Sequence, residues 1–149
     1  MLPRWVYAAI GDIATTALFS RLHAAVYHAL RGRGVDHALG CEIVLLETVG
    51  RKTGRPHEVP LFAFRDGPRL VVIASRGGNA RHPEWFLNLR SRPEATVRAG
   101  VKAAEVSARV ATGAERERLW SLAARAYPGY ETYRERTDRA IPVVVLEAT

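Results

Sequence analysis

A short turn that is rich in cations is the first chemically informative part of the chain. The letters GRKTGR place Arg51, Lys52 and Arg55 within one six-residue turn between two apolar runs. A hairpin turn needs glycines such as Gly50 and Gly54, but it does not need three cations. Cations beside free backbone N–H groups bind phosphate or carboxylate, and each charge-assisted hydrogen bond contributes about 1.5–3 kcal/mol. The turn therefore indicates an anion site, with a solvated, charged hairpin tip as the alternative.

A second segment combines a strand end, two adjacent glycines and an aromatic helix. Residues 75–89 read SRGGNARHPEWFLNL. Adjacent glycines let a backbone approach a ligand closely, and residues three apart on a helix share one face. This arrangement suits a planar, polar, anionic ligand, with core packing as the alternative for the tryptophan. The candidate binding residues of the segment are Ser75, Arg76, Gly77, Gly78, Trp85 and Asn88.

Three tyrosines at a spacing of three residues form the third candidate feature. Tyr127, Tyr130 and Tyr133 are three of the five tyrosines of the chain. On a helix or in a tight turn, this spacing places the side chains along one stripe. Phenol groups can stack on a flat ligand and donate a proton. The stripe is consequently a candidate substrate-binding and catalytic surface, or else an aromatic patch of the core or of an oligomer interface.

Charge and composition narrow the range of partners and chemistries. The formal net charge of +7, from 22 basic and 15 acidic residues, favours an anionic partner. The five histidines are scattered and Cys41 is the single cysteine, so we expect no metal site and no internal disulfide. The chain has no GxSxG segment and no close carboxylate pair, which argues against the corresponding hydrolases. It also lacks a nucleic-acid-binding motif, so we expect no nucleic-acid partner.

The first thirty residues are predicted to be helical. Residues 4–30 have apolar residues at helical spacing and no proline, which predicts one helix, or two short helices broken near Gly11. Flanking arginines would allow residues 1–30 to lie on a membrane surface, whereas packing on the rest of the domain is the alternative. No signal-peptide pattern is present. We therefore expect a cytoplasmic location, with association to the inner face of the cell membrane as a further option.

The rest of the chain predicts an α+β fold with a small barrel. A helix is expected to begin near Pro83, and a capping box formed by Thr112 and Glu115 is expected to begin another. Most strands are joined as hairpins, without the strand–helix alternation of parallel sheets, and this pattern favours an antiparallel barrel. The expected strands lie within residues 43–46, 59–64, 70–74, 95–98, 103–110 and 141–148.

The three features together resemble the deazaflavin-dependent nitroreductase family, which includes the F420H2-dependent quinone reductases. The resemblance runs from about residue 42 to the C-terminus, through GRKTG, Pro60-Leu61, SRGG, HPEWFLNL, RPEATV, YPGYETY and TDRAIPVVV. It implies a split β-barrel of about six mostly antiparallel strands with flanking helices. The barrel, a deazaflavin-binding domain, would span residues 41–149 and follow an N-terminal helical segment over residues 1–40. The implied activity is hydride transfer from reduced coenzyme F420 to a quinone, a nitroaromatic compound or an activated enone.

The resemblance also implies roles for individual residues. Arg51, Lys52 and Thr53 would hold the cofactor's phosphate and its oligoglutamate tail, and His57 stands at the position of a further family arginine. The residues implied around the deazaflavin are Pro60, Leu61, Ser75, Arg76, Gly77, Gly78, Trp85 and Asn88. Those implied around the acceptor are Phe62, Ser75, Tyr127, Tyr130 and Tyr133, of which Tyr133, Tyr130 or Ser75 would donate the proton.

Two other functions are compatible with the same residues. An FMN-dependent oxidoreductase of the same barrel type is one, although the single phosphate of FMN needs fewer cations than GRKTGR offers. A basic, non-enzymatic module that binds anionic lipid or nucleic acid is the other. In the favoured interpretation the partner is a small-molecule quinone or nitro acceptor, and pairing of barrels through exposed sheet faces would give a homodimer.

Overall fold

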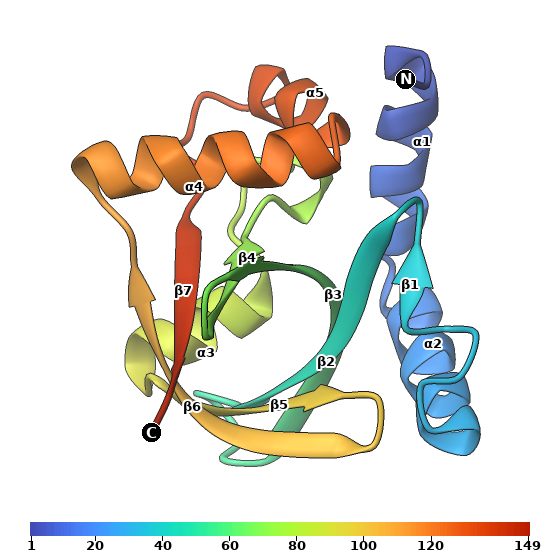
Figure 1. Ribbon diagram of the computed structural model, residues 1–149, viewed down its shortest axis with the longest axis vertical. Helices are drawn as coiled ribbons and strands as arrows, with labels where there is room; N and C mark the ends of the chain where they lie inside the picture. The colour runs from blue at the N-terminus through green and yellow to red at the C-terminus, as the bar shows by residue number, and fades with distance from the viewer.

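Seven strands form one antiparallel sheet that closes on itself (Figure 1). The computed structural model describes residues 1–149. Strand β5 pairs with both β6 and β2, for example through Leu46↔Val97, so six strands form a barrel. Strand β1 is a two-residue addition at the edge of β2. In sheet order the strands are β1 (His37–Ala38), β2 (Cys41–Val49), β3 (Pro56–Asp66), β4 (Arg69–Ile73), β7 (Val143–Ala148), β6 (Lys102–Val110) and β5 (Glu94–Ala99).

The barrel confirms the predicted fold class, and its burial explains the apolar run in β2. Val44 and Leu46 pack into a core cluster together with Trp85 and other residues of the helix that follows Pro83. The two alternate residues, Ile43 and Leu45, pack on the other side against Tyr27. Both faces of this strand are covered, which is why its sequence is continuously apolar instead of alternating.

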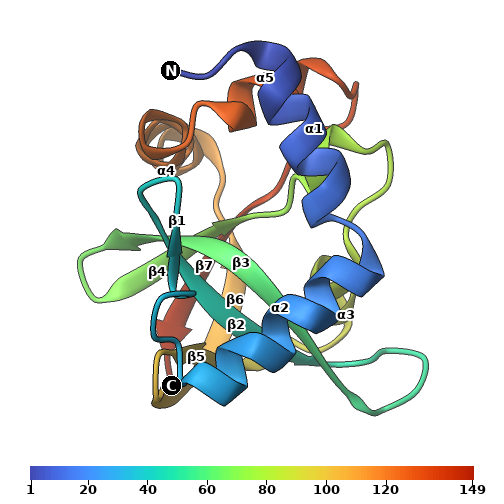
Figure 2. The same cartoon turned by 90° about the vertical axis from the view of Figure 1, so that its right-hand side faces the viewer.

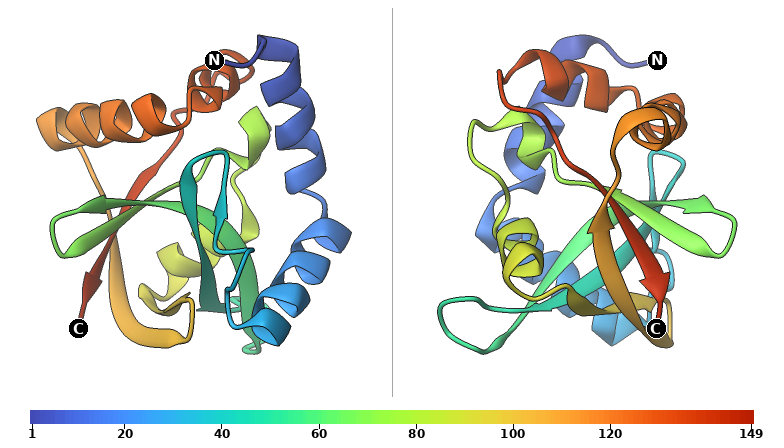
Figure 3. Two further views of the ribbon diagram at one scale, coloured as in Figure 1. Left: turned by 45° about the vertical axis from the view of Figure 1, so that its right-hand side comes forward. Right: turned by 90° about the vertical axis from the view of Figure 1, so that its left-hand side faces the viewer.

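Five helices and one 3-10 turn surround the barrel. Helices α4 and α5 lie across one end of it, while α1 and α2 run along its side (Figures 1 and 2). The two chain termini lie at opposite ends of the molecule (Figure 3). None of the helices is both long enough and apolar enough to cross a bilayer. The elements are α1 (Arg4–Ala14), α2 (Ala17–Leu30), η1 (Arg76–Gly78), α3 (Glu84–Ser91), α4 (Gly113–Ala126) and α5 (Gly129–Glu135).

The N-terminal segment consists of two helices, but the predicted break near Gly11 is wrong. The break falls at Thr15–Thr16, where the Thr16 hydroxyl accepts a hydrogen bond from the Phe19 N–H at 3.3 Å and begins α2. Gly11 lies inside α1. A Cβ atom there would stand 2.7 Å from Cε1 of Tyr133 and 3.0 Å from Cα of Gly77. The glycine therefore permits a close helix contact and does not end a helix.

Helix α4 begins at the expected place, but without the predicted capping box. The side chain of Thr112 makes no capping hydrogen bond. The Glu115 carboxylate instead accepts hydrogen bonds from Arg109 at 2.6 and 3.0 Å and from Arg69 at 3.3 Å. Two guanidinium groups offer this carboxylate stronger, charge-assisted partners than a backbone N–H does. Sequence spacing alone did not reveal these distant arginines.

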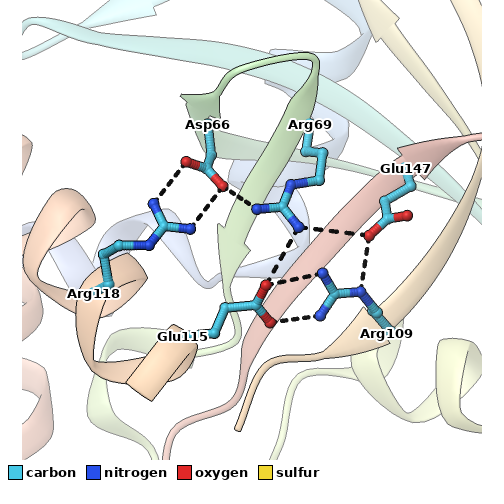
Figure 4. A network of polar contacts seen from close by, with 6 residues as sticks. All are labelled: Asp66, Arg69, Arg109, Glu115, Arg118 and Glu147. Carbon is cyan, nitrogen blue, oxygen red and sulfur yellow. Dashed lines mark hydrogen bonds and ion pairs between the residues drawn. The ribbon is translucent and has the colours of Figure 1, made fainter. Parts of the chain in front are cut away.

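The same arginines belong to an ion-pair network that joins α4 to four strands (Figure 4). Asp66 accepts hydrogen bonds from Arg118 at 2.8 and 3.1 Å and another from Arg69. Glu147 accepts from Arg109 at 2.8 Å. The hydrogen bonds from Arg118 and then from Arg69 lower the pKa of Asp66 to about 2. The network thus ties the β3–β4 turn, β6 and β7 to α4.

Candidate functional site

A cavity of about 690 Å³ lies between the N-terminal helices and the barrel. Its walls come from α1, α2, β3, η1 and the start of α3, and the tyrosines around α5 also line it. About half of its lining residues are hydrophobic. A cavity of this size, with apolar walls and a few polar groups, suits one small organic ligand.

The cavity brings together residues that lie far apart in the sequence. Eleven of the predicted site residues line it, whereas Arg51, Lys52, Thr53, Gly78 and Asn88 lie outside its lining. The lining set is His57, Pro60, Leu61, Phe62, Ser75, Arg76, Gly77, Trp85, Tyr127, Tyr130 and Tyr133.

The cationic turn is the tip of the β2–β3 hairpin, which projects from the body of the molecule (Figure 2). The Gly50 N–H donates to the Arg55 carbonyl oxygen at 2.8 Å, and the Gly54 N–H donates to the Gly50 carbonyl oxygen at 2.7 Å. The Arg55 N–H donates to the Thr53 hydroxyl at 3.2 Å, so this hydroxyl helps to shape the turn. The Lys52 and Arg55 side chains are exposed.

Arg51 connects this turn to helix α3. Its backbone N–H and its Nη1 both donate to Oδ1 of Asn88 at 3.1 Å, and Nη1 also donates to Oε2 of Glu84 at 2.6 Å. Asn88 is buried, and its Nδ2 donates to the Thr48 hydroxyl at 3.1 Å. Trp85 and Asn88 were predicted to share one helix face. In the structure Trp85 lines the cavity, whereas the amide of Asn88 fixes the turn against α3.

The loop after β4 has an unusual backbone. Arg76, Gly77 and Gly78 have φ angles of 46°, 61° and 82°, so all three adopt the left-handed region. A Cβ atom at Gly77 would lie 3.0 Å from the carbonyl carbon of Gly11, and one at Gly78 would lie 2.6 Å from the Tyr133 carbonyl oxygen. The space beside both glycines is therefore filled by α1 and α5, and close packing of these helices requires glycine at both positions.

Arg139 holds this loop in place, and the sequence analysis gave it no role. Its Nη2 donates to the carbonyl oxygens of Ser75 at 2.9 Å and Ala74 at 3.2 Å, and its Nε donates to that of Asn79 at 2.8 Å. Its Nη1 lies 3.1 Å from Nδ1 of His82. Burial, and then the nearby charge of Arg76, lowers the pKa of Arg139. One guanidinium group thus fixes the backbone that carries the predicted residues 75–78.

The three tyrosines form a buried cluster whose hydroxyl groups have defined directions. The Tyr133 hydroxyl donates to the carbonyl oxygen of Tyr7 at 3.0 Å, and it lies 2.7 Å from the Tyr127 hydroxyl. Since Tyr133 has only one hydroxyl proton, Tyr127 is the donor in the second bond. Burial is the largest cause of the raised pKa of Tyr127, Tyr130 and Tyr133. All three are therefore neutral proton carriers near pH 7.

The wall formed by the N-terminal helices is the main feature that sequence reasoning missed. Ile10, Gly11, Ala14, Phe19 and His23 all line the cavity. The available signal was the isolated glycine inside a helical pattern, which often marks a close contact. A helix without a recognisable motif gave no other indication that it faces a site.

The fold and the site define a small antiparallel barrel protein with a cation-rich hairpin and an aromatic cavity. The family model for F420H(2)-dependent quinone reductases matches residues 19–148. An F420H(2)-dependent quinone reductase of Mycobacterium tuberculosis is 33% identical over 150 residues, which cover 97% of each chain.

Two solved structures are also similar. One is described as an F420-H2 dependent reductase, with a TM-score of 0.66 and 40% identity over 70% of this chain and 93% of that one. The other is described as a domain-swapped dimer, with a TM-score of 0.69 and 35% identity over 85% of this chain and 94% of that one.

The chain belongs to the F420H(2)-dependent quinone reductase family. It is an oxidoreductase, and coenzyme F420 in its reduced form is its cofactor. The match begins well before residue 42, the expected start of the resemblance, and it includes nearly all of α2. The helical lead-in is therefore shared with relatives, in agreement with its place in the cavity wall.

Proposed function

We propose that the chain transfers a hydride from reduced coenzyme F420 to a quinone, with nitroaromatic compounds and activated enones as further acceptors. The observation that carries this proposal is the cavity, whose lining combines apolar side chains with three protonated tyrosines. The cationic hairpin lies outside this lining and reaches it through the contact of Arg51 with Glu84. The apolar wall fits the ring of a quinone, and neutral phenols near pH 7 fit the need for a proton donor.

The residues present fit the cofactor in charge. We propose that Lys52, Arg51 and Thr53 hold its phosphate and acidic tail, because Lys52 stands exposed at the hairpin tip. Arg76 and His57 line the cavity nearby. The proposed cofactor set is completed by Pro60, Leu61, Ser75, Gly77, Gly78, Trp85 and Asn88. Of these, Gly78 acts by shaping the loop backbone, and Asn88 acts by holding the cationic turn.

When bound, the reduced cofactor supplies the hydride, and the residues of this chain orient the acceptor and provide the proton. The Tyr133 hydroxyl releases the Tyr7 carbonyl oxygen and donates its proton to the developing oxyanion. Tyr127 stands behind it at 2.7 Å, in position to return a proton to Tyr133. The hydroxyls of Ser75 and Tyr130 are further donors in the same cavity.

The acceptor lies, in this proposal, against Phe62 and the tyrosines. Phe62 and Tyr127 meet edge to face with ring centroids 5.0 Å apart, which gives the acceptor an aromatic wall. Phe62 has no hydroxyl, so this position selects by shape and not by hydrogen bonding. A flat, apolar acceptor such as a quinone suits this wall better than a strongly polar one.

We propose that the chain works in the cytoplasm and that α1 and α2 contact the inner face of the cell membrane. The support is a set of exposed apolar side chains, since Trp5, Ile13, Leu18 and Leu22 are each more than half exposed. Arg4 and Arg21 lie on the same two helices. Flotation with vesicles of anionic phospholipid tests this contact, and a Trp5→Ser, Leu18→Ser protein should not float.

We also propose that the chain forms a homodimer. The support is the solved relative described as a domain-swapped dimer, whose match covers 85% of this chain. Sedimentation equilibrium should give twice the 16.5 kDa mass of one chain. A single species at the monomer mass over the whole concentration range would contradict the dimer.

A parallel titration with coenzyme F420 and with FMN, followed by fluorescence, tests the proposed function. We expect tight binding of coenzyme F420 alone and weaker binding by a Lys52→Ala protein. Lys102, the only other lysine, is exposed in β6 and gives the matched control Lys102→Ala, which should bind as the wild type does. Binding of FMN instead would favour the FMN-dependent alternative. Binding of neither would favour the non-enzymatic module.

A further inference from the structure

One carboxylate stands among the cations of the site. Glu84 is the first residue of α3, lines the cavity and places Oε2 at 2.6 Å from Nη1 of Arg51. Its side chain is 56% exposed, whereas that of Arg51 is 22% exposed. Glu58, the other glutamate of the lining, is held by His28 at 2.8 Å. Glu84 is therefore the acidic residue of the lining that contacts the cationic turn.

The charges of three cations act on this carboxylate, and one of them, Arg51, is in contact with it. The hydrogen bond from Arg51 and the charges of Arg51, Lys52 and Arg76 hold the pKa of Glu84 below its ordinary value. Glu84 is consequently ionised near pH 7 and fills a position that suits a phosphate or carboxylate oxygen.

We propose that Glu84 sets the affinity of the chain for the anionic part of its cofactor, because its carboxylate occupies the guanidinium group of Arg51 and must leave it when the ligand binds. This inference rests on the proposed function of the same cavity. Glu84 acts here as an internal competitor, so its removal should strengthen binding. If Glu84 merely oriented Arg51, its removal would weaken binding.

The local structure allows this exchange without unfolding the turn. Arg51 keeps its two hydrogen bonds to Oδ1 of Asn88 when Glu84 turns away. Asn88 in turn stays attached to the Thr48 hydroxyl at 3.1 Å. The exposed carboxylate can rotate into solvent, and the guanidinium group remains in place to receive another anion.

The test compares a Glu84→Gln protein with the wild type in a titration with coenzyme F420. Glutamine keeps the size of the side chain and removes the charge. We expect roughly three- to tenfold tighter binding. The substitution removes the ion pair that competes with the ligand for Arg51, and it also removes the repulsion between the Glu84 carboxylate and the anionic ligand. The gain should shrink as salt is raised.

A matched control is available at Glu94, which lies 3.8 Å from Arg92 in another exposed ion pair away from the cavity. Glu94→Gln should leave the affinity unchanged. Equal or weaker binding by Glu84→Gln, while the wild type binds coenzyme F420, would overturn this inference and leave the proposed function intact.

A second probe separates the two proposals further. Inorganic pyrophosphate offers the anionic groups without the ring, and its binding can be followed by the tryptophan fluorescence of the protein. If the wild type bound no coenzyme F420, the proposed function would fail. Tighter pyrophosphate binding by Glu84→Gln would then still support the competitor role, and unchanged pyrophosphate binding would refute it.

Discussion

The contact between α1 and the tyrosine cluster yields the sharpest structural prediction. Gly11 sits in the middle of α1, where alanine would normally be the better helix former by about 1 kcal/mol. A Cβ atom at this position, however, would lie 2.7 Å from Cε1 and 2.9 Å from Cζ of Tyr133, and 3.0 Å from Cα of Gly77. Carbon atoms in contact normally stand about 3.5–4.0 Å apart. Gly11→Ala therefore forces a displacement of about 0.5–1 Å.

Neither neighbour can move freely to make room. The Tyr133 hydroxyl is held by Tyr7 and Tyr127, and Gly77 lies in the left-handed loop that Arg139 fixes. Overpacking costs about 1–3 kcal/mol, and because neither neighbour is free to yield we expect the upper part of this range, about 2–3 kcal/mol. After the gain in helix propensity is subtracted, Gly11→Ala should lower the free energy of unfolding by about 1–2 kcal/mol. It should also weaken cofactor binding, because Gly11 and Gly77 both line the cavity.

Urea unfolding followed by tryptophan fluorescence measures the effect, and far-UV circular dichroism shows whether the variant is folded. Ala9 is an exposed position of the same helix, and Ala9→Gly should lower the free energy of unfolding by roughly 0.5–1 kcal/mol without any effect on cofactor affinity. The protein is thus expected to be more stable with alanine than with glycine at residue 9, and more stable with glycine than with alanine at residue 11. A Gly11→Ala protein as stable as the wild type, or more stable, would refute the close packing of α1 on Tyr133.

Three further predictions concern the tyrosines, the loop and the ion-pair network. Tyr133→Phe should lower turnover and keep cofactor affinity. It should also reduce the free energy of unfolding by about 1–2 kcal/mol, because the Tyr127 hydroxyl and the Tyr7 carbonyl each lose a hydrogen-bond partner. Unchanged turnover would show that Tyr133 is not the proton donor. Arg139→Gln should raise the Kd for coenzyme F420 about tenfold in the folded protein, with partial rescue by Arg139→Lys; an unchanged Kd would remove Arg139 from the positioning of the loop. Asp66 has a pKa of about 2, lower than in the unfolded chain, so its stabilisation is complete above about pH 4 and is lost toward about pH 2. The urea midpoint should therefore drop less between about pH 5 and about pH 3 for Asp66→Asn than for the wild type. An equal drop in the two proteins would contradict the role of the network.

The sequence was sufficient for the features that depend on local patterns. The apolar run at 43–46 and the valines of 143–145 each predicted a strand that the structure confirms. The fold class followed because these strands are linked as hairpins. The candidate site was predictable to the extent that motif residues line one cavity.

The errors and omissions all concern contacts between distant residues. Gly11 was interpreted as a helix break because its partner, Tyr133, lies 122 residues further along the chain. Glu115 was assigned to a capping box because its real partners, Arg69 and Arg109, come from two strands. The role of Arg139 was missed for the same reason, because the carbonyl oxygens that accept its hydrogen bonds lie about sixty residues earlier in the chain. No periodicity in a single sequence encodes such pairs.

The most direct test of the account is hydride transfer itself, measured in a single turnover. Reduced coenzyme F420 is mixed with the protein and then with menadione in the absence of oxygen, and the return of the oxidised cofactor's absorbance is followed. The account predicts reoxidation that depends on the protein and is slowed by Tyr133→Phe. Reoxidation at the rate of the protein-free mixture, in a sample shown to bind the cofactor, would contradict the proposed quinone reductase activity.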